Sequence, residues 1–282
     1  AEDSGSDQVI YCAATVSYEQ PVGDMTSILY VYRYDPDGDQ NGNDDWVQIA
    51  QKTTNSDEQI QFDQDVALAG GEGDDLKGKL VIFWARVNHD SEDLYGYTLS
   101  DADDRTNAVN NFSGTTLVRD KNYSAMDADW DPNTGVQRPR LTWTEKDGTI
   151  YKVKAAQITI DSQTGQPSGT TQEYTISDNS SNSAENPTIS VNRYSGNDDK
   201  FEAFNSHSYG TSGARVEVDT NANGVDTWED PVVVKTGINS EEMAVTYRHF
   251  GIPKHGWIVG GKAYKDEVQI SLYSTEGIRF TT

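Results

Sequence analysis

Two loops rich in carboxylate and amide side chains carry the most specific chemical pattern in this sequence. Each begins with oxygen-bearing side chains at its first, third and fifth positions, followed by a glycine at the sixth. The residues are Asp37, Asp39, Asn41 and Asp44 in the first loop, and Asp219, Asn221, Asn223 and Asp226 in the second. Alternation along the chain turns the oxygens toward one centre, and the glycine lets the backbone reverse beside them. The spacing predicts calcium as the cofactor, with metal-free Asx turns as the alternative.

A third segment has similar oxygen spacing, but it departs from this pattern. Asp129, Asp131 and Asn133 alternate, with Pro132 inside the loop. Because proline restricts the backbone there, this segment is a weaker calcium candidate than the other two. The two main loops also share an ending that the third lacks, since each reaches a tryptophan, Trp46 or Trp228, before an apolar strand.

Carboxylate pairs could also serve glycoside hydrolysis, which needs two acids roughly 5 to 10 Å apart. The chain has 46 acidic residues, so their abundance alone selects none of them. We single out the carboxylates beside apolar segments, with ordinary solvated acids as the alternative. They are Asp127, Asp129, Glu145 and Glu202.

Aromatic residues near predicted strand ends could form platforms on which sugar rings stack. Packing between neighbouring sheets is the simpler expectation for most of them. The set comprises Trp84, Tyr95, Tyr97, Trp130, Trp143, Tyr209, Tyr247 and Trp257.

Other chemistries lack their usual residues. The sequence contains no Gly-Lys-Ser/Thr phosphate loop, no Gly-x-Ser-x-Gly elbow and no cysteine pair. Of the four histidines only His249 and His255 could flank one hairpin, and structural or surface roles are expected for all four. The lone Cys12 lies in an apolar run, which predicts a buried, inert thiol.

The charge balance is strongly acidic, with 22 basic residues against 46 acidic ones and a net charge of -24. Such a chain repels a phosphate backbone or an anionic membrane, so we expect no nucleic acid partner. It suits a salty, halophilic or marine environment, or a surface neutralised by divalent cations. No apolar segment approaches the roughly 20 residues of a membrane span, so no membrane insertion is expected. The start Ala1-Glu2-Asp3-Ser4 is typical of a mature terminus left by cleavage, which favours an extracellular or cell-surface location.

The elements that must position these residues are strands. Short runs of β-branched and aromatic residues recur throughout, bounded by Gly, Asn, Asp and Pro, whereas helical periodicity is almost absent. The predicted strands are 8–16, 27–34, 46–52, 79–87, 93–99, 115–119, 140–145, 149–160, 171–177, 187–192, 200–205, 214–218, 231–235, 243–250, 256–263, 267–273 and 278–282. The predicted class is all-β.

Very apolar strands recur at starts near residues 80, 140, 187 and 243, each followed by more polar strands. These spacings are close to the roughly 40 to 50 residues of a propeller blade with added loops. We therefore predict a single β-propeller domain over residues 1–282, with five blades most favoured and four or six still open. The apolar strand of each blade is expected to be innermost. Residues 8–16 would begin the first blade or complete the last, and a pair of β-sandwiches is the alternative architecture.

The stretch Asn223-Gly224-Val225-Asp226-Thr227-Trp228 resembles the Asp-box hairpin of sialidase-like propellers, and 41–47 is a poorer copy. Both loops are also similar to the calcium hairpins of the integrin-type propeller. The resemblance implies a propeller fold, and an Asp box lies away from a sialidase's catalytic centre. The arginine triad and the Phe-Arg-Ile-Pro-like segment of that family are missing, so the resemblance implies no sialidase chemistry.

These observations predict a secreted, calcium-binding β-propeller that acts as a glycan- or protein-binding or surface-structural module, with possible self-assembly. The alternative is a propeller-type glycoside hydrolase. The enzyme question stays open and leans toward a non-enzyme, because the stabilising loops are explicit while catalytic motifs are missing.

Overall fold

The computed structural model describes most of the chain. The described residues are 10–19, 25–34, 46–54, 59–60, 66–70, 79–88, 91–102, 107–121, 123–131, 138–177, 183–191, 201–209, 216–222, 228, 232–235, 240–249, 255–263, 267–274 and 279–281. Within them, the regular elements are 22 β-strands in five sheets, so the all-β prediction is confirmed. None of these residues belongs to a helix long and apolar enough to cross a membrane.

The chain divides into two compact units. The first unit comprises Ala1–Asp120 with Asp161–Pro167, and the second comprises Lys121–Ile160 with Ser168–Thr282. Whether they form the single domain predicted from the sequence stays a prediction.

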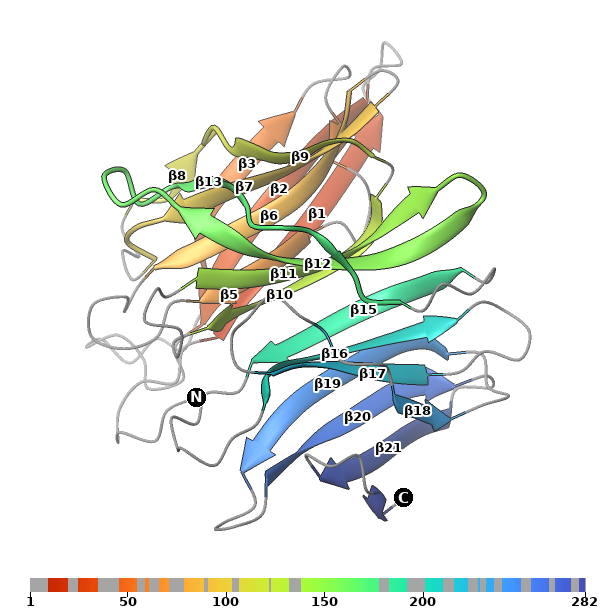
Figure 1. Ribbon diagram of the computed structural model, residues 1–282. Coiled ribbons are helices and arrows are strands. Elements are labelled where there is room, and N and C mark those ends of the chain that lie inside the picture. Colours follow the sequence, from red (N-terminus) through yellow and green to blue (C-terminus); the bar gives the residue numbers. More distant parts are fainter. Residues whose placement is uncertain are drawn as a thin grey trace. The chain divides into compact units, whose positions relative to one another are not determined.

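The first unit contains two sheets (Figure 1). Sheet A has the strand order β1-β2-β3-β8, and sheet B has the order β4-β6-β7-β9 with β5 also paired to β6. The strands of sheet A are β1 (Ile10–Glu19), β2 (Met25–Tyr34), β3 (Val47–Thr54) and β8 (Val109–Asn110). Those of sheet B are β4 (Gln59–Ile60), β5 (Val66–Gly70), β6 (Leu80–Asn88), β7 (Ser91–Leu99) and β9 (Thr115–Lys121).

The second unit contains three sheets. Sheet C has the order β10-β11-β12-β13 with β14 also on β12, sheet D runs β15-β16-β17-β18, and sheet E runs β19-β20-β21-β22. Sheet C comprises β10 (Tyr123–Asp131), β11 (Arg138–Asp147), β12 (Ile150–Ile160), β13 (Pro167–Thr170) and β14 (Tyr174–Thr175). Sheet D comprises β15 (Ala184–Val191), β16 (Phe201–Tyr209), β17 (Val216–Ala222) and β18 (Val232–Lys235). Sheet E comprises β19 (Ser240–His249), β20 (His255–Ala263), β21 (Glu267–Ser274) and β22 (Arg279–Thr281).

Sheets D and E are meanders in which each strand pairs with the next along the chain. In Figure 1, the strands of each of these sheets follow one another in chain order across the sheet. Four antiparallel strands in this order are the arrangement of a propeller blade. The number of blades and the closure of a ring remain predictions.

Trp84 and Phe112 lie in the core of the first unit among mainly aliphatic side chains. Trp84 on β6 is fully buried, stacks on Tyr95 with ring centroids 5.6 Å apart, and meets Phe112 edge-on at 5.5 Å. The Nζ of Lys52 lies 5.7 Å from the Trp84 ring centroid and donates a hydrogen bond to the Phe112 carbonyl at 2.8 Å. A strand apolar on both faces, such as β6, is buried on both sides and belongs inside a sheet.

This placement corrects the prediction that the very apolar strands are innermost. The strands beginning near residues 80 and 140, β6 and β11, have a partner on each side, because β5 and β10 pair with them. The prediction overlooked β10, and also the short strands β4, β5, β8 and β13. In sheets D and E the apolar strands β15 and β19 do stand at a sheet edge.

The first strand shows which sheet residues 8–16 join, and it corrects the prediction that Cys12 is buried. β1 pairs with β2 from Ile10 opposite Tyr34 to Glu19 opposite Met25, so it begins the first sheet. Cys12 is exposed, which contradicts the expected buried thiol. The reason is the two-residue period of a strand: Tyr11 and Ala13 pack against the core, so Cys12 points to the opposite face.

Candidate functional site

The register of sheet C gathers polar residues from its first three strands on one face. Asp129, Arg140 and Gln157 lie directly opposite one another on β10, β11 and β12. Asp127, Thr142 and Ala155 form the neighbouring row, because they are two residues along each strand. Directly opposite residues share a face of the sheet, so both rows point the same way.

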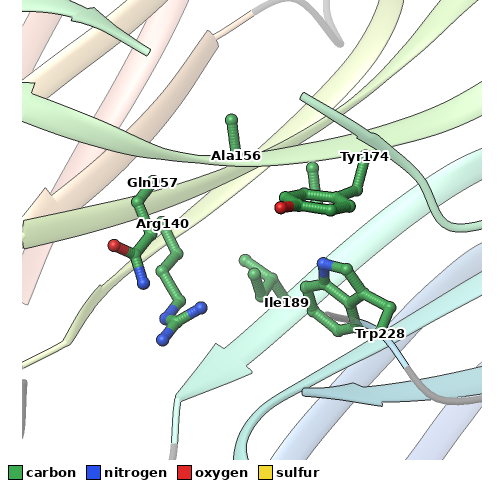
Figure 2. A pocket seen from close by; sticks show the side chains of 7 residues that line it. Arg140, Ala156, Gln157, Tyr174, Ile189 and Trp228 are labelled. Atoms are coloured by element: carbon green, nitrogen blue, oxygen red, sulfur yellow. The ribbon is translucent and has the colours of Figure 1, made fainter. Parts of the chain in front are cut away.

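A small pocket lies on this face, between sheets C and D of the second unit. Figure 2 shows its lining side chains, with the Arg140 guanidinium and the Gln157 amide on one side and the Tyr174 and Trp228 rings on the other. The remaining lining residues are Ala155, Ala156 and Ile189. Its enclosed space is about 10 Å³. A space of this size has room for about one water molecule, so only a group lying at the mouth of the pocket can meet its lining residues.

Arg140 is the charged residue of the pocket and is almost fully buried, at 3% exposure. A guanidinium keeps its charge when buried and presents donors in a planar fork that matches carboxylate oxygens. Trp228 and Tyr174 pack against the small core of Val153, Ala155, Ile176 and Ala184, which holds both rings in place. The pocket therefore combines a fixed cation, an amide and two aromatic rings.

Two carboxylates border the pocket, and both are tied to β15. The Oδ2 of Asp127 accepts the Ile189 N–H at 2.9 Å and the Thr188 hydroxyl at 2.7 Å. The Oδ2 of Asp129 accepts the Val191 N–H at 2.8 Å.

These contacts join two sheet edges. β10 ends sheet C and β15 ends sheet D, so alternate N–H groups of β15 have no strand to pair with on that side. Aspartates two residues apart on β10 supply the acceptors instead. A bulge in β15 between Glu185 and Thr188, with Asn186 at a φ of 54°, sets where this contact begins.

Burial raises the pKa of Asp127 to about 6. Desolvation is the largest cause, and the hydrogen bonds from Ile189, Thr188 and Ala128 oppose it because they favour the ionised form. The neighbouring charge of Asp129 adds to the rise. A carboxyl group with such a pKa can gain or lose a proton near neutral pH, but its oxygens are occupied by the contacts to β15.

The other two carboxylates singled out from the sequence do not join this pair. Glu145 is buried on the opposite face of β11, where its Oε2 accepts the Trp143 indole N–H at 3.2 Å. Its Oε1 lies 3.9 Å from the Nζ of Lys154. Glu202 lies in β16, and its side chain falls outside the described residues. The structure thus brings together Asp127 and Asp129, and separates Glu145 from them.

Most predicted calcium ligands lie outside the described residues. This holds for Asp37, Asp39, Asn41, Asp44, Asn223 and Asp226. Asp219 and Asn221 are placed in β17, opposite Asn205 and Ala203 of β16, although their side chains are not described. In the part of the chain whose side chains are described, no cluster of acidic, histidine or cysteine residues could hold a metal ion.

Of the weaker third candidate, Asp129 uses its carboxylate on β15, while Asn133 lies outside the described residues. The two histidines expected to flank a hairpin are confirmed as neighbours, since His249 and His255 pair across β19 and β20.

The expected sugar platforms are largely core residues. Trp84, Trp130 and Trp143 are at most 2% exposed, and Tyr95 and Tyr97 pack against the core of the first unit. Packing was therefore the better expectation for these five residues. Tyr209, Tyr247 and Trp257 lie in β16, β19 and β20, with side chains outside the described part.

Sequence reasoning missed the pocket itself. Arg140 was recognised only as the start of an apolar strand, and Trp228 only as the end of a loop. An arginine at the start of an apolar strand was the available signal, because a charged residue in such a run is almost never fully buried unless it is paired. Nothing in the sequence pairs Gln157 or Tyr174 with Arg140, since that proximity depends on strand register.

Comparison with known proteins supports the fold. No family model matches the sequence, and no curated protein matches it. The structure of an ulvan lyase, a polysaccharide lyase bound to a saccharide of glucuronate and sulfated rhamnose, aligns over 92% of this chain with a TM-score of 0.50 and 9% identity. This chain spans 64% of that lyase.

Two other similar structures have lower TM-scores. An exo-1,5-α-L-arabinanase from a bovine ruminal metagenomic library gives 0.44, with 11% identity over 99% of this chain and 98% of the arabinanase. The NanB sialidase of Streptococcus pneumoniae gives 0.42, with 11% identity over 98% of this chain and 49% of the sialidase. The similar structures are β-propeller glycoside hydrolases and lyases. At this identity, the likeness to the ulvan lyase shows a shared fold alone.

Proposed function

We propose that this chain is a β-propeller protein that binds and cleaves a polysaccharide, as a glycoside hydrolase or a polysaccharide lyase. The observation that carries the proposal is the fold likeness to a saccharide-bound polysaccharide lyase over 92% of the chain. That likeness favours the enzyme alternative over the purely binding module to which the sequence pointed. The proposal is also supported by the pocket, whose residue types suit a sugar.

Four lining residues have a definable role toward a saccharide. The rings of Tyr174 and Trp228 offer apolar surface to the C–H face of a sugar, and the Gln157 amide can donate to and accept from its hydroxyls. The Arg140 guanidinium suits a carboxylate substituent. We place the saccharide at the mouth of this pocket, because its enclosed space of about 10 Å³ holds no more than about one water molecule.

The net charge of -24 constrains which polysaccharide can approach. An anionic chain is repelled over distances of about 30 Å at 0.01 M salt and about 10 Å at 0.1 M, whereas a neutral chain is not repelled. Binding of a uronate-rich polysaccharide should therefore strengthen as salt rises, the reverse of ordinary ion pairing. Binding of a neutral polysaccharide should change little with salt.

The test is incubation with a panel of neutral and uronate-containing polysaccharides. New reducing ends would be measured for either reaction, and ultraviolet absorbance of an unsaturated uronate product identifies a lyase. Trp228→Ala and Tyr174→Ala, which each remove a ring, should lower turnover, whereas Lys146→Ala, an exposed change on β11, should not. Binding without product would return the chain to the binding-module function. Neither binding nor product would overturn the proposal.

Two further properties stay proposals that rest on the sequence. We propose that the loops containing residues 37–44 and 219–226 bind calcium, which would hold their hairpins. We also propose an extracellular or cell-surface location, where polysaccharides and millimolar calcium occur together. The acidic composition supports both.

A further inference from the structure

A short segment of sheet C carries the Tyr174 ring of the pocket. Residues 171–177 run beside β12, and their central strand β14 pairs Tyr174 with Ala155 and Thr175 with Lys154. We call residues 171–177 the strap. The strap, β12 and the residues that line the pocket all belong to the second unit, so the contacts among them are internal to that unit.

A hydroxyl residue at each end of the strap brackets one residue of β12. At one end, the N–H of Thr171 donates to the Gln157 carbonyl at 2.9 Å, and its Oγ1 accepts the Gln157 N–H at 3.2 Å. At the other end, the N–H of Ser177 donates to the Val153 carbonyl at 3.5 Å, and its Oγ accepts the Val153 N–H at 3.2 Å. The two hydroxyls therefore accept N–H groups of β12 that the backbone of a longer neighbouring strand would otherwise accept.

The middle of the strap is fixed on both of its faces. Tyr174 and Ile176 are two residues apart, so they share a face. Ile176 is 4% exposed in the small core against which the Tyr174 and Trp228 rings pack. Thr175 points the other way, and its Oγ1 accepts a hydrogen bond from the Nζ of Lys154 at 2.7 Å. Because the ladder of β14 is two residues long, the brackets supply much of the attachment that keeps the Tyr174 ring beside the pocket (Figure 2).

We propose that Thr171 and Ser177 are positioning residues for the saccharide site, which set the Tyr174 ring at the mouth of the pocket by holding both ends of the strap. A sugar at this mouth stacks on the Tyr174 and Trp228 rings. A ring that is already held in its bound position binds more tightly, because ordering it on binding would cost conformational entropy. The Thr171 bracket also holds the backbone of Gln157, whose amide lines the same pocket. The inference rests on the proposed function, because it assigns these hydroxyls to the proposed saccharide site.

Hydrogen exchange measured by mass spectrometry tests the brackets without a ligand. Thr171→Val and Ser177→Ala should each make the peptide 171–177 exchange faster by about threefold to tenfold, the change expected for one lost hydrogen bond. Thr171→Ser keeps the hydroxyl and should restore the native rate. Ser100→Ala, at an exposed serine of the first unit, is the control, and thermal melts establish that each variant folds. Unchanged exchange in both bracket variants would overturn the inference.

Affinity electrophoresis in gels containing soluble xylan or polygalacturonate tests whether the brackets act through Tyr174. Thr171→Val and Ser177→Ala should each weaken retention by about threefold to tenfold. In a Tyr174→Ala background neither change should weaken it further, because the ring that the brackets position is gone. A loss of the same size in both backgrounds would mean a general structural role, which overturns the inference.

Kinetics separate the inference from the proposed function. The bracket variants should raise KM on a cleaved polysaccharide and leave kcat unchanged, because neither hydroxyl is placed at the reacting atoms. If the native chain cleaves a polysaccharide and the variants share its KM, the positioning role is wrong and the function stands. If xylan or polygalacturonate is retained but never cleaved, and the variants weaken that retention, the positioning role stands and the enzymatic function is wrong.

Discussion

The carboxylate of Asp127 accepts a hydrogen bond from the backbone N–H of Ile189 at 2.9 Å. Asp127 lies on β10 at the edge of sheet C, and it supplies the acceptor that a neighbouring strand would otherwise provide for β15 at the edge of sheet D. Removing that acceptor leaves the Ile189 N–H and the Thr188 hydroxyl unpaired in a partly buried site. We expect Asp127→Ala to lower the free energy of unfolding by about 1 to 3 kcal/mol. Asp127→Asn should cost less, because an amide oxygen can still accept one donor. Urea denaturation measures both, with Asp101→Ala at an exposed carboxylate as the control.

The raised pKa of Asp127 makes stability depend on pH in a defined direction. Its folded-state value of about 6 lies above the ordinary value of 3.8, so the native state binds more protons between these limits. Stability should therefore fall as pH rises from about 4 to 6 and level off above it, by at most about 3 kcal/mol. Asp127→Asn does not titrate, so the difference between its pH–stability curve and the native one isolates this group from the other acids. If the pH–stability curves of the native protein and Asp127→Asn run parallel, the raised pKa of Asp127 is wrong.

Gly114 is required by the Trp84 ring. A Cβ at position 114 would collide with the six-membered ring of that indole, lying 2.6 Å from its Cζ2. We expect Gly114→Ala to destabilise the chain by about 1 to 3 kcal/mol, because the fully buried tryptophan has no room to move. Gly70→Ala, where a Cβ meets nothing within 4 Å, should be neutral or slightly stabilising. Thermal melts of the two variants give the comparison.

The proposed calcium loops should stabilise the folded state by mass action. Calcium at 100 times its dissociation constant adds about 2.7 kcal/mol, so adding EDTA should lower the melting temperature. Asp39→Ala and Asn223→Ala should each shrink that shift, and elemental analysis should find calcium in the dialysed protein. If EDTA does not change the melting temperature and the protein contains no metal, the loops do not bind calcium.

Deletion of residues 1–16 should destroy cooperative folding. It removes most of β1, including Tyr11 and Ala13, which pack against the core of the first unit, and it leaves β2 unpaired on that side. A soluble product of this deletion with an unchanged melt would favour separate sandwiches over a propeller.

Strand positions were predictable from sequence wherever apolar and polar residues alternate or run together. β6 and β11 follow from their apolar runs, and β19 to β21 from similar patterns. β10 was missed because Asp127, Asp129 and Asp131 made it resemble a loop. An edge strand can carry such acids, because its neighbour across the sheet boundary uses them as hydrogen-bond acceptors, and that neighbour cannot be known before the fold.

The residues of the candidate pocket could be predicted from the sequence only in part, because strand register brings them together. Asp127 and Asp129 could be chosen from their apolar surroundings, but Arg140 and Gln157 join them only through the register of three strands. Register also decided the exposure of Cys12, where a shift of one residue would have exchanged the two faces of β1. Sequence composition holds no information on either point.

Trp228 connects two features that would otherwise be separate. It follows the loop predicted to bind calcium, and its ring lines the pocket beside Tyr174. An ion that held this loop would restrict the position of the ring, and a ligand in the pocket would restrict it from the other side. Thermodynamic linkage makes this effect reciprocal. If bound calcium raises the affinity for a saccharide by some factor, bound saccharide must raise the affinity for calcium by the same factor.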